Sequence, residues 1–440
     1  MLQFLAIHET LFGMNAGIHL KRMELRRGKR QGITRDQMFG NCHETRTRFI
    51  SKACLERLER ASDWLVENVL PIGWIALLTG MFWIGDRSHY HRLYYALLLT
   101  PAALAIFLSP ARLKALFSSP LLIVFILFGG YVTLSIAWSG SANSAGALAK
   151  RPLYVLFLFF SGGLLALQSP KRLMSGIQTG AAIATLLGAA SLGLYVRDGM
   201  PGRLAGYGAL SNPLLSSHVY GFFMAFWLAD WFLRKRPIAP ASLFSLLVFG
   251  ILVVATGSRT PLVALAACCA WLMLAHWNRR SLILLAAVIL TGAGVLIFHP
   301  EGLFSRGTSL RPEIWRAIWP QIHDAFWFGH GYDTPMRIVI PDAFADPHNL
   351  LLGVLYDCGV VGLALWLSLY AFALAFAWRN RKEPLVMIAS TLAVFGFMAG
   401  MTEGRDFLSR PKEHWFLIWI PMTLLFSAGM MHKRKDVHAS

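Results

Sequence analysis

Three arginines lie in short polar segments beside apolar runs, a setting that suits recognition of an anionic ligand. Arg203 lies in G-R-L-A-G-Y-G, Arg259 in G-S-R-T-P and Arg311 in S-L-R-P-E-I-W. A guanidinium at a membrane boundary is costly unless it is solvated or paired, and its planar fork suits bidentate binding of phosphate. The three side chains together could bind one diphosphate. The alternative is that each of them extends to lipid headgroups.

Three histidines are candidates for proton transfer or for hydrogen bonding to a substrate. His348 lies in D-A-F-A-D-P-H-N-L-L-L-G, where a polar stretch ends and an apolar run begins. An imidazole there suits general-base chemistry near neutral pH, whereas Asp346 is expected only to cap the following helix. His330 in F-G-H-G-Y is a second candidate, unless it serves only a tight turn. His218 in S-S-H-V-Y-G either faces a polar cavity or bonds a neighbouring helix.

Metal and nucleotide sites have patterns that this sequence does not contain. Asp342, Asp346 and His348 are close in the chain but form no recognised ligand spacing, so we expect no metal. The five cysteines fit no zinc or haem pattern. There is no glycine-rich phosphate loop of the Walker type, so we expect neither a cofactor nor a nucleotide.

The elements that must position these residues are transmembrane helices. Hydrophobic residues make up 56% of the 440-residue chain, and the mean hydropathy is +0.52. Apolar runs of roughly 17–25 residues are long enough to span a bilayer. We therefore predict an all-α polytopic membrane protein with about twelve transmembrane helices. The predicted spans are 64–85, 93–109, 119–138, 152–168, 173–197, 213–233, 241–256, 260–277, 281–298, 350–378, 384–402 and 414–431.

Charge predicts the orientation of these spans. The net charge of +18 would favour nucleic-acid binding in a soluble protein. In a membrane protein, however, basic residues collect in the cytoplasmic loops, so we expect no nucleic-acid partner. Most Lys and Arg lie in the two tails and in alternate loops, which predicts that both termini are cytoplasmic. The predicted parts are a basic cytoplasmic N-terminal tail (1–60), a transmembrane domain (61–432) and a cytoplasmic C-terminal tail (433–440).

Two features of the predicted transmembrane domain are irregular. The run 350–378 is too long for one straight helix, and Gly359 and Gly362 predict a break within it. Residues 299–349 form a large periplasmic loop, and loops of that length are usually functional. Within the loop, 309–328 has the spacing of a short amphipathic helix, which either lies on the membrane surface or packs on the spans beneath. Its predicted apolar face contains Ile314, Trp315, Ile318, Trp319 and Ile322.

Taken in order, these motifs resemble those of the O-antigen ligase and polymerase superfamily. The matching parts are G-S-R-T-P, R-P-E-I-W-R-A-I-W, F-G-H-G-Y and P-H-N-L-L-L-G-V-L-Y-D-C-G-V-V-G-L. The resemblance covers about residues 60–432, and its specific part is about 250–365. It implies a metal-independent inverting glycosyltransferase of the bacterial inner membrane, whose active site faces the periplasm. Its donor would be an O-antigen glycan linked to undecaprenyl diphosphate, bound among membrane lipids, and its acceptor would be lipid A–core.

The resemblance also implies roles for single residues. The catalytic residues would be His348, Arg311 and Arg259. The residues that bind the diphosphate or the glycan would be Arg203, Arg259, Arg311, Arg316, His330 and His218.

Other activities stay open at this point. A polymerase of the same superfamily would use a lipid-linked repeat unit as its acceptor, and a protein O-oligosaccharyltransferase would use a Ser or Thr of a protein. A membrane transporter would need charged residues along a path through the spans. The predicted spans contain few of these, namely Glu67, Asp230 and Asp357.

Overall fold

The computed structural model describes residues 55–234, 239–298, 311–337 and 346–439. The chain divides into two compact units, Met1–Arg60 and Ala61–Ser440. Most of the predicted basic tail (1–60) lies outside the described residues. Parts of the predicted periplasmic loop, 299–310 and 338–345, also lie outside them.

All the regular secondary structure in the described residues of the second unit is helical. In chain order the helices are η2 (Leu65–Val69), α4 (Leu70–Trp83), α5 (Arg87–Tyr94), η3 (Tyr95–Leu99), α6 (Thr100–Leu108), α7 (Ala111–Leu116), α8 (Pro120–Ser135), η4 (Ile136–Trp138), α9 (Ala145–Gln168), α10 (Pro170–Arg197), α11 (Pro213–Leu233), α12 (Pro240–Ala255), α13 (Thr260–Ala275), α14 (Arg279–Phe298), α16 (Arg311–Asp324), α17 (Leu350–Arg379), α18 (Pro384–Gly400), α19 (Glu413–Leu417) and α20 (Trp419–Ala439).

Each predicted apolar segment lies on one of these helices or on two or three consecutive ones. Several of the helices start at a proline, whose fixed φ suits the first turn of a helix. The chain is a polytopic membrane protein. Within the described residues, seven helical stretches are long and apolar enough to cross a membrane: Leu55–Trp83, Arg87–Leu108, Pro120–Trp138, Ala145–Gln168, Pro170–Arg197, Leu350–Arg379 and Glu413–Arg434. Three apolar helices are shorter: Pro240–Ala255, Thr260–Ala275 and Pro384–Gly400.

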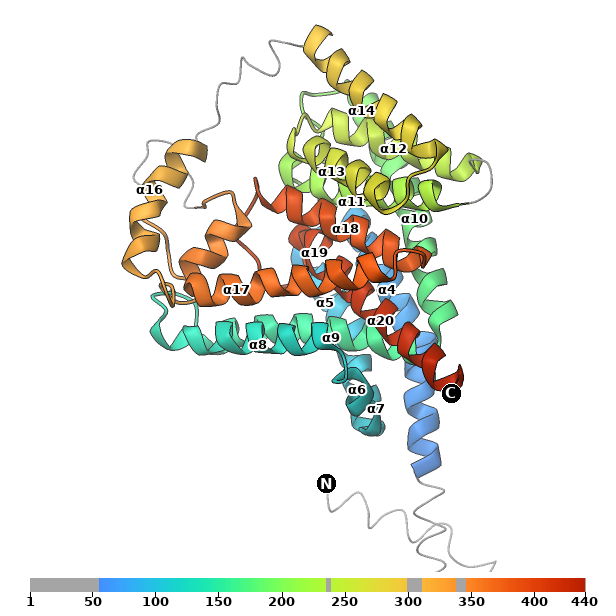
Figure 1. Ribbon diagram of the computed structural model, residues 1–440, viewed down its shortest axis with the longest axis vertical. Coiled ribbons are helices and arrows are strands. Elements are labelled where there is room, and N and C mark those ends of the chain that lie inside the picture. The colour runs from blue at the N-terminus through green and yellow to red at the C-terminus, as the bar shows by residue number, and fades with distance from the viewer. Residues whose placement is uncertain (1–54, 235–238, 299–310, 338–345, 440) are drawn as a thin grey trace, which may run out of the picture. The chain divides into compact units, whose positions relative to one another are not determined.

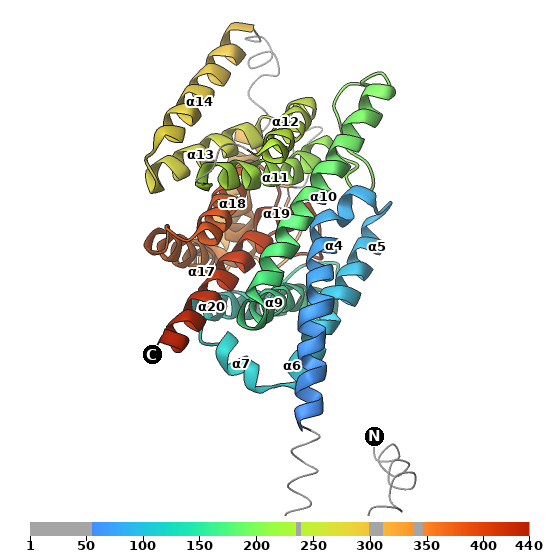
Figure 2. The same cartoon turned by 90° about the vertical axis from the view of Figure 1, so that its right-hand side faces the viewer.

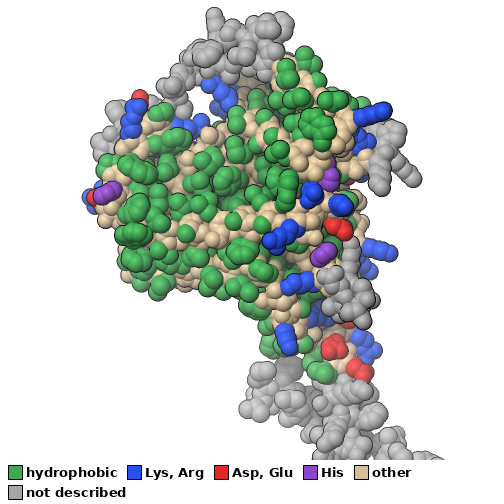
Figure 3. Space-filling view, in the orientation of Figure 1, with side chains coloured by type: hydrophobic (Ala, Val, Ile, Leu, Met, Phe, Trp, Pro, Cys, Tyr) green, Lys and Arg blue, Asp and Glu red, His purple; other side chains and the backbone are tan. Residues whose placement is uncertain are grey.

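The helices pack around one continuous hydrophobic core. Helix α17 lies beside α8, and α20 lies beside α9 (Figure 1). Figure 2 shows α4 and α10 side by side on another face of the bundle. Helix α11 contacts α12, α18 and α19, so it lies inside the bundle. A broad apolar surface covers α8 and α17, and charged side chains gather at its two ends (Figure 3). This distribution is expected for a surface that faces lipid.

Helix α17 breaks at Gly359, as the sequence predicts. Gly359 has a φ of 62°, and a β-carbon there would lie 2.4 Å from the backbone of Trp327. The backbone groups freed by the break pair with residues 326–331, which overlap the F-G-H-G-Y motif, so they are not left unsatisfied in the membrane. We call this pairing of residues 326–331 with 356–361 the break contact. Its N–H donors are His330, Gly331, Val360 and Val361, and the respective carbonyl acceptors are Tyr356, Asp357, Phe326 and Trp327.

Helix α16 packs on the first half of α17. Ile314, Ile318 and Ile322 are buried, and the last two lie in a small apolar cluster with Leu355 and Tyr356 of α17. The helix is shorter than the predicted 309–328, and Trp319 is exposed rather than part of the buried face. The reason is geometric: residues at i, i+4 and i+8 face α17, and Trp319 lies just beyond that stripe. Of the two predicted placements, α16 has the one in which it packs on a neighbouring span.

Candidate active site

The carboxylate of Glu403 connects two of the predicted site residues. Nη2 of Arg311 donates a 2.7 Å hydrogen bond to Oε1 of Glu403. Nδ1 of His348 lies 3.9 Å from the other carboxylate oxygen, Oε2, which is beyond direct hydrogen-bond distance. The side chain of Glu403 is only 2% exposed, so its charge is poorly screened and acts strongly on both neighbours.

Two contacts hold the Glu403 segment against the first half of α17. The side-chain amide of Asn349 donates to the carbonyl of Met401 at 3.0 Å. Nη2 of Arg405 lies 2.5 Å from Oδ1 of Asp357, and both side chains are largely buried. Glu403 lies between these two attachment points in the sequence. Its position relative to His348, which directly precedes Asn349, is therefore fixed at both ends.

His348 has an unusual backbone conformation at the start of α17. Its φ is 47°, in the left-handed region, and its N–H donates to Oδ1 of Asp346 at 2.8 Å. Helix α17 is capped by Asn349, which accepts from the N–H groups of Leu351 and Leu352. The prediction that Asp346 caps this helix is therefore wrong, because the tight turn directs its carboxylate to His348.

The surroundings of His348 favour its charged form. The carboxylate of Glu403 raises the pKa of His348 above its ordinary value of 6.5, and the nearby charge of Asp346 acts in the same direction. Burial and the positive charge of Arg311 oppose this shift. Since Nδ1 faces Glu403, the ring presents Nε2 as its second functional nitrogen. A histidine oriented in this way by a carboxylate is a familiar general base.

The other two arginines lie on the turn between α12 and α13 and on the loop that covers it. Nε of Arg203 donates to the carbonyl of Thr256 at 2.7 Å, and both Arg203 and Arg259 are exposed. The hydroxyls of Thr260 and Thr402 share a 2.9 Å hydrogen bond. Thr260 follows Arg259, and Thr402 precedes Glu403. The structure thus brings this turn next to the segment that contacts Arg311 and His348.

The three remaining predicted residues lie in different surroundings. Arg316 is exposed on α16. The ring of His330 lies 4.5 Å from that of Tyr356, and its Nε2 pairs with the carbonyl of Gln321 at 2.7 Å, so it belongs to the break contact. His218 on α11 is completely buried, within electrostatic range of Glu403 and Arg311. Neither ring nitrogen of His218 has a hydrogen-bond partner among the described residues.

The sequence interpretation missed Glu403 and Arg405. Both lie in M-T-E-G-R-D, directly after the predicted span 384–402. A signal was present, since an acidic residue flanked by apolar runs at the predicted periplasmic boundary requires a partner. The partners of Glu403, however, lie far away in the chain, and the sequence alone does not identify them.

The described residues contain no cluster of metal-binding side chains. Among residues 55–234, 239–298, 311–337 and 346–439, no three His, Cys, Asp or Glu side chains are grouped so that they could hold a metal ion. The ionisable groups of the candidate site are instead a carboxylate, an imidazole and arginines. This composition suits binding of an anion together with proton transfer.

The chain is similar to proteins of one known family. Residues 243–367 match a family model described as O-antigen ligase. An O-antigen ligase from Pseudomonas aeruginosa is 51% identical over 383 residues, which cover 86% of this chain and 95% of that relative. The matched family region contains Arg259, Arg311 and His348.

Proposed function

Because this chain belongs to the O-antigen ligase family, we propose that it completes lipopolysaccharide by transferring a glycan from undecaprenyl diphosphate to lipid A–core oligosaccharide. The observation that supports the proposal most directly is the contact of one buried carboxylate, Glu403, with both Arg311 and His348. This arrangement joins a group that can bind a diphosphate to a group that can accept a proton. Glycosyl transfer from a lipid diphosphate needs both.

The arginines bind the donor in this proposal. Arg311 has five N–H donors, and among the described residues the hydrogen bond to Glu403 uses one of them, so other N–H groups of the guanidinium can bind phosphate oxygens. Arg259 approaches the diphosphate from the turn that contacts Thr402, and Arg203 approaches it from the loop that covers this turn. Together they stabilise the negative charge that develops on the leaving diphosphate, and this lowers the transition-state energy.

His348 acts on the acceptor. A sugar hydroxyl of the core donates its proton to Nε2 of His348 while its oxygen attacks the anomeric carbon of the donor. The bond between that carbon and the diphosphate oxygen breaks, and the electron pair leaves with the undecaprenyl diphosphate. Attack opposite the leaving group inverts the anomeric carbon. Glu403 is the positioning residue, because it orients the imidazole and stabilises the imidazolium that forms.

The membrane orientation follows from charge. With both termini in the cytoplasm, as the basic loops favour, the site lies at the periplasmic boundary of the bacterial inner membrane. His348, Arg311 and Glu403 then face the compartment in which both lipid-linked substrates present their glycans. We propose that the reaction needs no metal, no nucleotide and no cofactor, because the sugar–diphosphate bond itself supplies the energy.

The test is transfer by the purified protein between lipid-diphosphate glycan and lipid A–core, with EDTA present. The wild type is expected to produce capped lipopolysaccharide, while His348→Asn and Arg311→Ala are expected to lose at least about a hundredfold in kcat. Asn is the right replacement at residue 348 because it tolerates a positive φ. The matched controls are His89→Asn and Arg197→Ala, which change exposed side chains that contact nearby aspartates.

Each other outcome has a definite meaning. If the wild type lengthens the lipid-linked glycan and ignores lipid A–core, the site chemistry stands but the protein is a polymerase. If EDTA abolishes transfer and a divalent cation restores it, the metal-free mechanism is wrong. If no transfer of either kind occurs with folded protein, the proposed function fails.

A further inference from the structure

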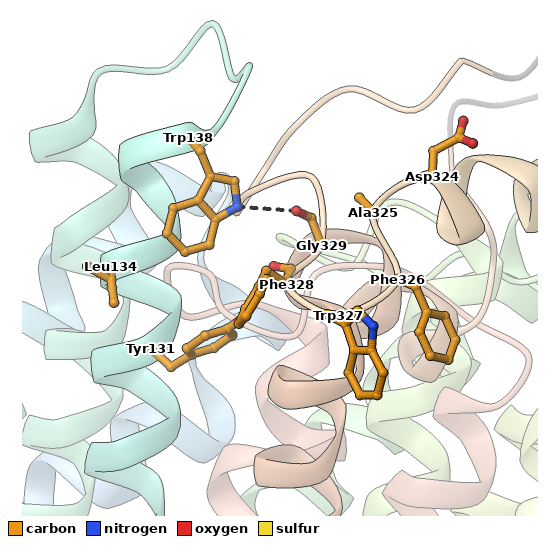
Figure 4. Close-up of a pocket in the computed structure, with 9 residues that line it drawn as sticks. All are labelled: Tyr131, Leu134, Trp138, Asp324, Ala325, Phe326, Trp327, Phe328 and Gly329. Carbon is orange, nitrogen blue, oxygen red and sulfur yellow. Dashed lines mark hydrogen bonds between the residues drawn. The ribbon is translucent and has the colours of Figure 1, made fainter.

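An open pocket of about 640 Å³ lies beside the break contact (Figure 4). One wall consists of Tyr131, Leu134 and Trp138, and the other consists of residues 324–329. The side chains of Trp327 and Phe328 are 63% and 61% exposed, respectively. Large apolar side chains at this exposure are ordinary singly, but a pocket lined by several of them indicates a binding surface.

Apart from the indole N–H of Trp327 and the carboxylate of Asp324, the polar side chains of this lining have hydrogen-bond partners among the described residues. The hydroxyl of Tyr131 donates to the carbonyls of Phe328 and Cys358 at 3.1 and 3.0 Å. The indole N–H of Trp138 donates to the carbonyl of Gly329 at 3.2 Å, the bond drawn in Figure 4. Backbone N–H groups satisfy the other wall, because the carbonyls of 325, 326 and 327 accept from Gly329, Val360 and Val361.

These hydrogen bonds within the lining limit the ligand chemistry that the pocket suits. A sugar needs hydrogen-bond donors and acceptors aimed at its hydroxyls, whereas a hydrocarbon chain needs apolar area without unsatisfied polar groups. Asp324 supplies the one carboxylate of the lining. The pocket also continues the exposed apolar side of α8, where Ile123, Leu127 and Leu134 point outward. The lining therefore fits a lipid chain at the end of a surface that faces hydrocarbon.

The distance from the active site favours one of the two substrate lipids. Helix α16 has Arg311 at its first residue and Asp324, in the pocket wall, at its last. Its 14 residues separate the two ends by roughly 20 Å, at about 1.5 Å per residue. The donor's prenyl chain is bonded directly to the diphosphate, so it must begin beside the arginines. In the acceptor, several core sugars separate the reacting hydroxyl from the lipid anchor.

We propose that this pocket binds an acyl chain of the acceptor's lipid A anchor while the end of the core reaches His348. The inference rests on the proposed function, because it assigns a place to one of the two substrates of that reaction. Fixing the anchor at the far end of α16 lets the core oligosaccharide extend along the helix toward the site.

The experiment compares two acceptors: complete lipid A–core, and the water-soluble core released by removing its acyl chains. Trp327→Ser is expected to raise the KM for the complete acceptor about threefold, a modest change because lipid surrounds both states and only packing is lost. The KM for the deacylated core and for the donor should not change. Leu134→Ala, on the opposite wall, should reproduce the effect, and Trp277→Ser changes an equally exposed indole outside the pocket as a control.

Three results would overturn the inference. An unchanged KM for the complete acceptor in both variants means that the pocket holds bulk lipid only. An equal rise with the deacylated core means that it binds sugar, and a rise in the donor's KM alone means that it binds the prenyl chain. Transfer by the wild type to either acceptor upholds the proposed function whatever the variants do, so the two failures are distinguishable.

Discussion

Arg311 donates a 2.7 Å hydrogen bond to Glu403, a carboxylate that lies between α18 and α19 and is 92 residues away in the chain. Arg311 is partly exposed, whereas Glu403 is almost completely buried. The arginine therefore connects solvent to an interior charge that also faces His348. Removing the charge of Glu403 should disturb both neighbours while leaving the shape of the site nearly unchanged.

Glu403→Gln is expected to lower kcat by about a hundredfold, with a smaller change in the KM for the donor. The amide keeps the size of the carboxylate but no longer stabilises the imidazolium of His348 in the transition state. Initial-rate measurements on purified protein, beside a thermal unfolding curve, provide the test. Glu383→Gln, at an exposed position before α18, is the matched control. If a folded Glu403→Gln variant keeps the kcat of the wild type, the proposed role of Glu403 in the mechanism is wrong.

The pH dependence of transfer tests the same contact in another way. The proposed base must be neutral, and the carboxylate of Glu403 raises the pKa of His348 above 6.5. Activity should therefore rise with pH, with its midpoint above pH 6.5 in the profile of kcat/KM. In Glu403→Gln the largest cause of the shift is gone, so the midpoint should move to lower pH. An identical midpoint in both proteins would contradict the assignment of this pH-dependent rise in activity to His348.

The Arg405–Asp357 pair should contribute to stability more than any surface pair. Arg405→Ala leaves the carboxylate of Asp357 buried without its partner, so unfolding should become easier by about 3–5 kcal/mol. Arg197→Ala, which removes an exposed pair with Asp198, should cost less than about 1 kcal/mol. Thermal unfolding in detergent measures both. The double variant Asp357→Leu with Arg405→Met should recover much of the loss, and an unchanged Tm for Arg405→Ala would contradict the argument.

Gly359→Ala tests the break in α17. The backbone conformation of Gly359 (φ 62°, ψ −169°) is essentially limited to glycine and costs about 1–3 kcal/mol for a residue with a β-carbon. The new methyl group would also overlap the backbone of Trp327. We expect a lower Tm and weaker transfer, because the break contact holds the first half of α17 in place. Gly130→Ala is the control, since a β-carbon at that position of α8 meets nothing within 4 Å. Equal Tm values for the two variants would argue against a structural role for the break.

Local patterns predicted the helices and the break but not their contacts. The length of the apolar runs was sufficient to locate the long helices, and Gly359 with Gly362 was sufficient to predict the discontinuity in α17. The partner of Arg311 was not predictable, because Glu403 reaches it only through the packing of α17 and α18. His218 shows the same limit: its sequence setting allowed a substrate-facing residue, yet its side chain is completely buried. The roles predicted for the seven site residues stay predictions: Arg203, His218, Arg259, Arg311, Arg316, His330 and His348.

The break contact has a mechanical consequence for a protein that handles a long, heavy glycan. Hydrogen bonds tie the segment after α16 to the middle of α17, and the buried isoleucines tie α16 itself to the first half of α17. A force on the bound glycan should therefore move α16 and the first half of α17 together as one rigid unit. Arg311 is the first residue of α16, and His348 lies just before the first residue of α17. Their spacing should survive movements that bring a bulky substrate in or let it go.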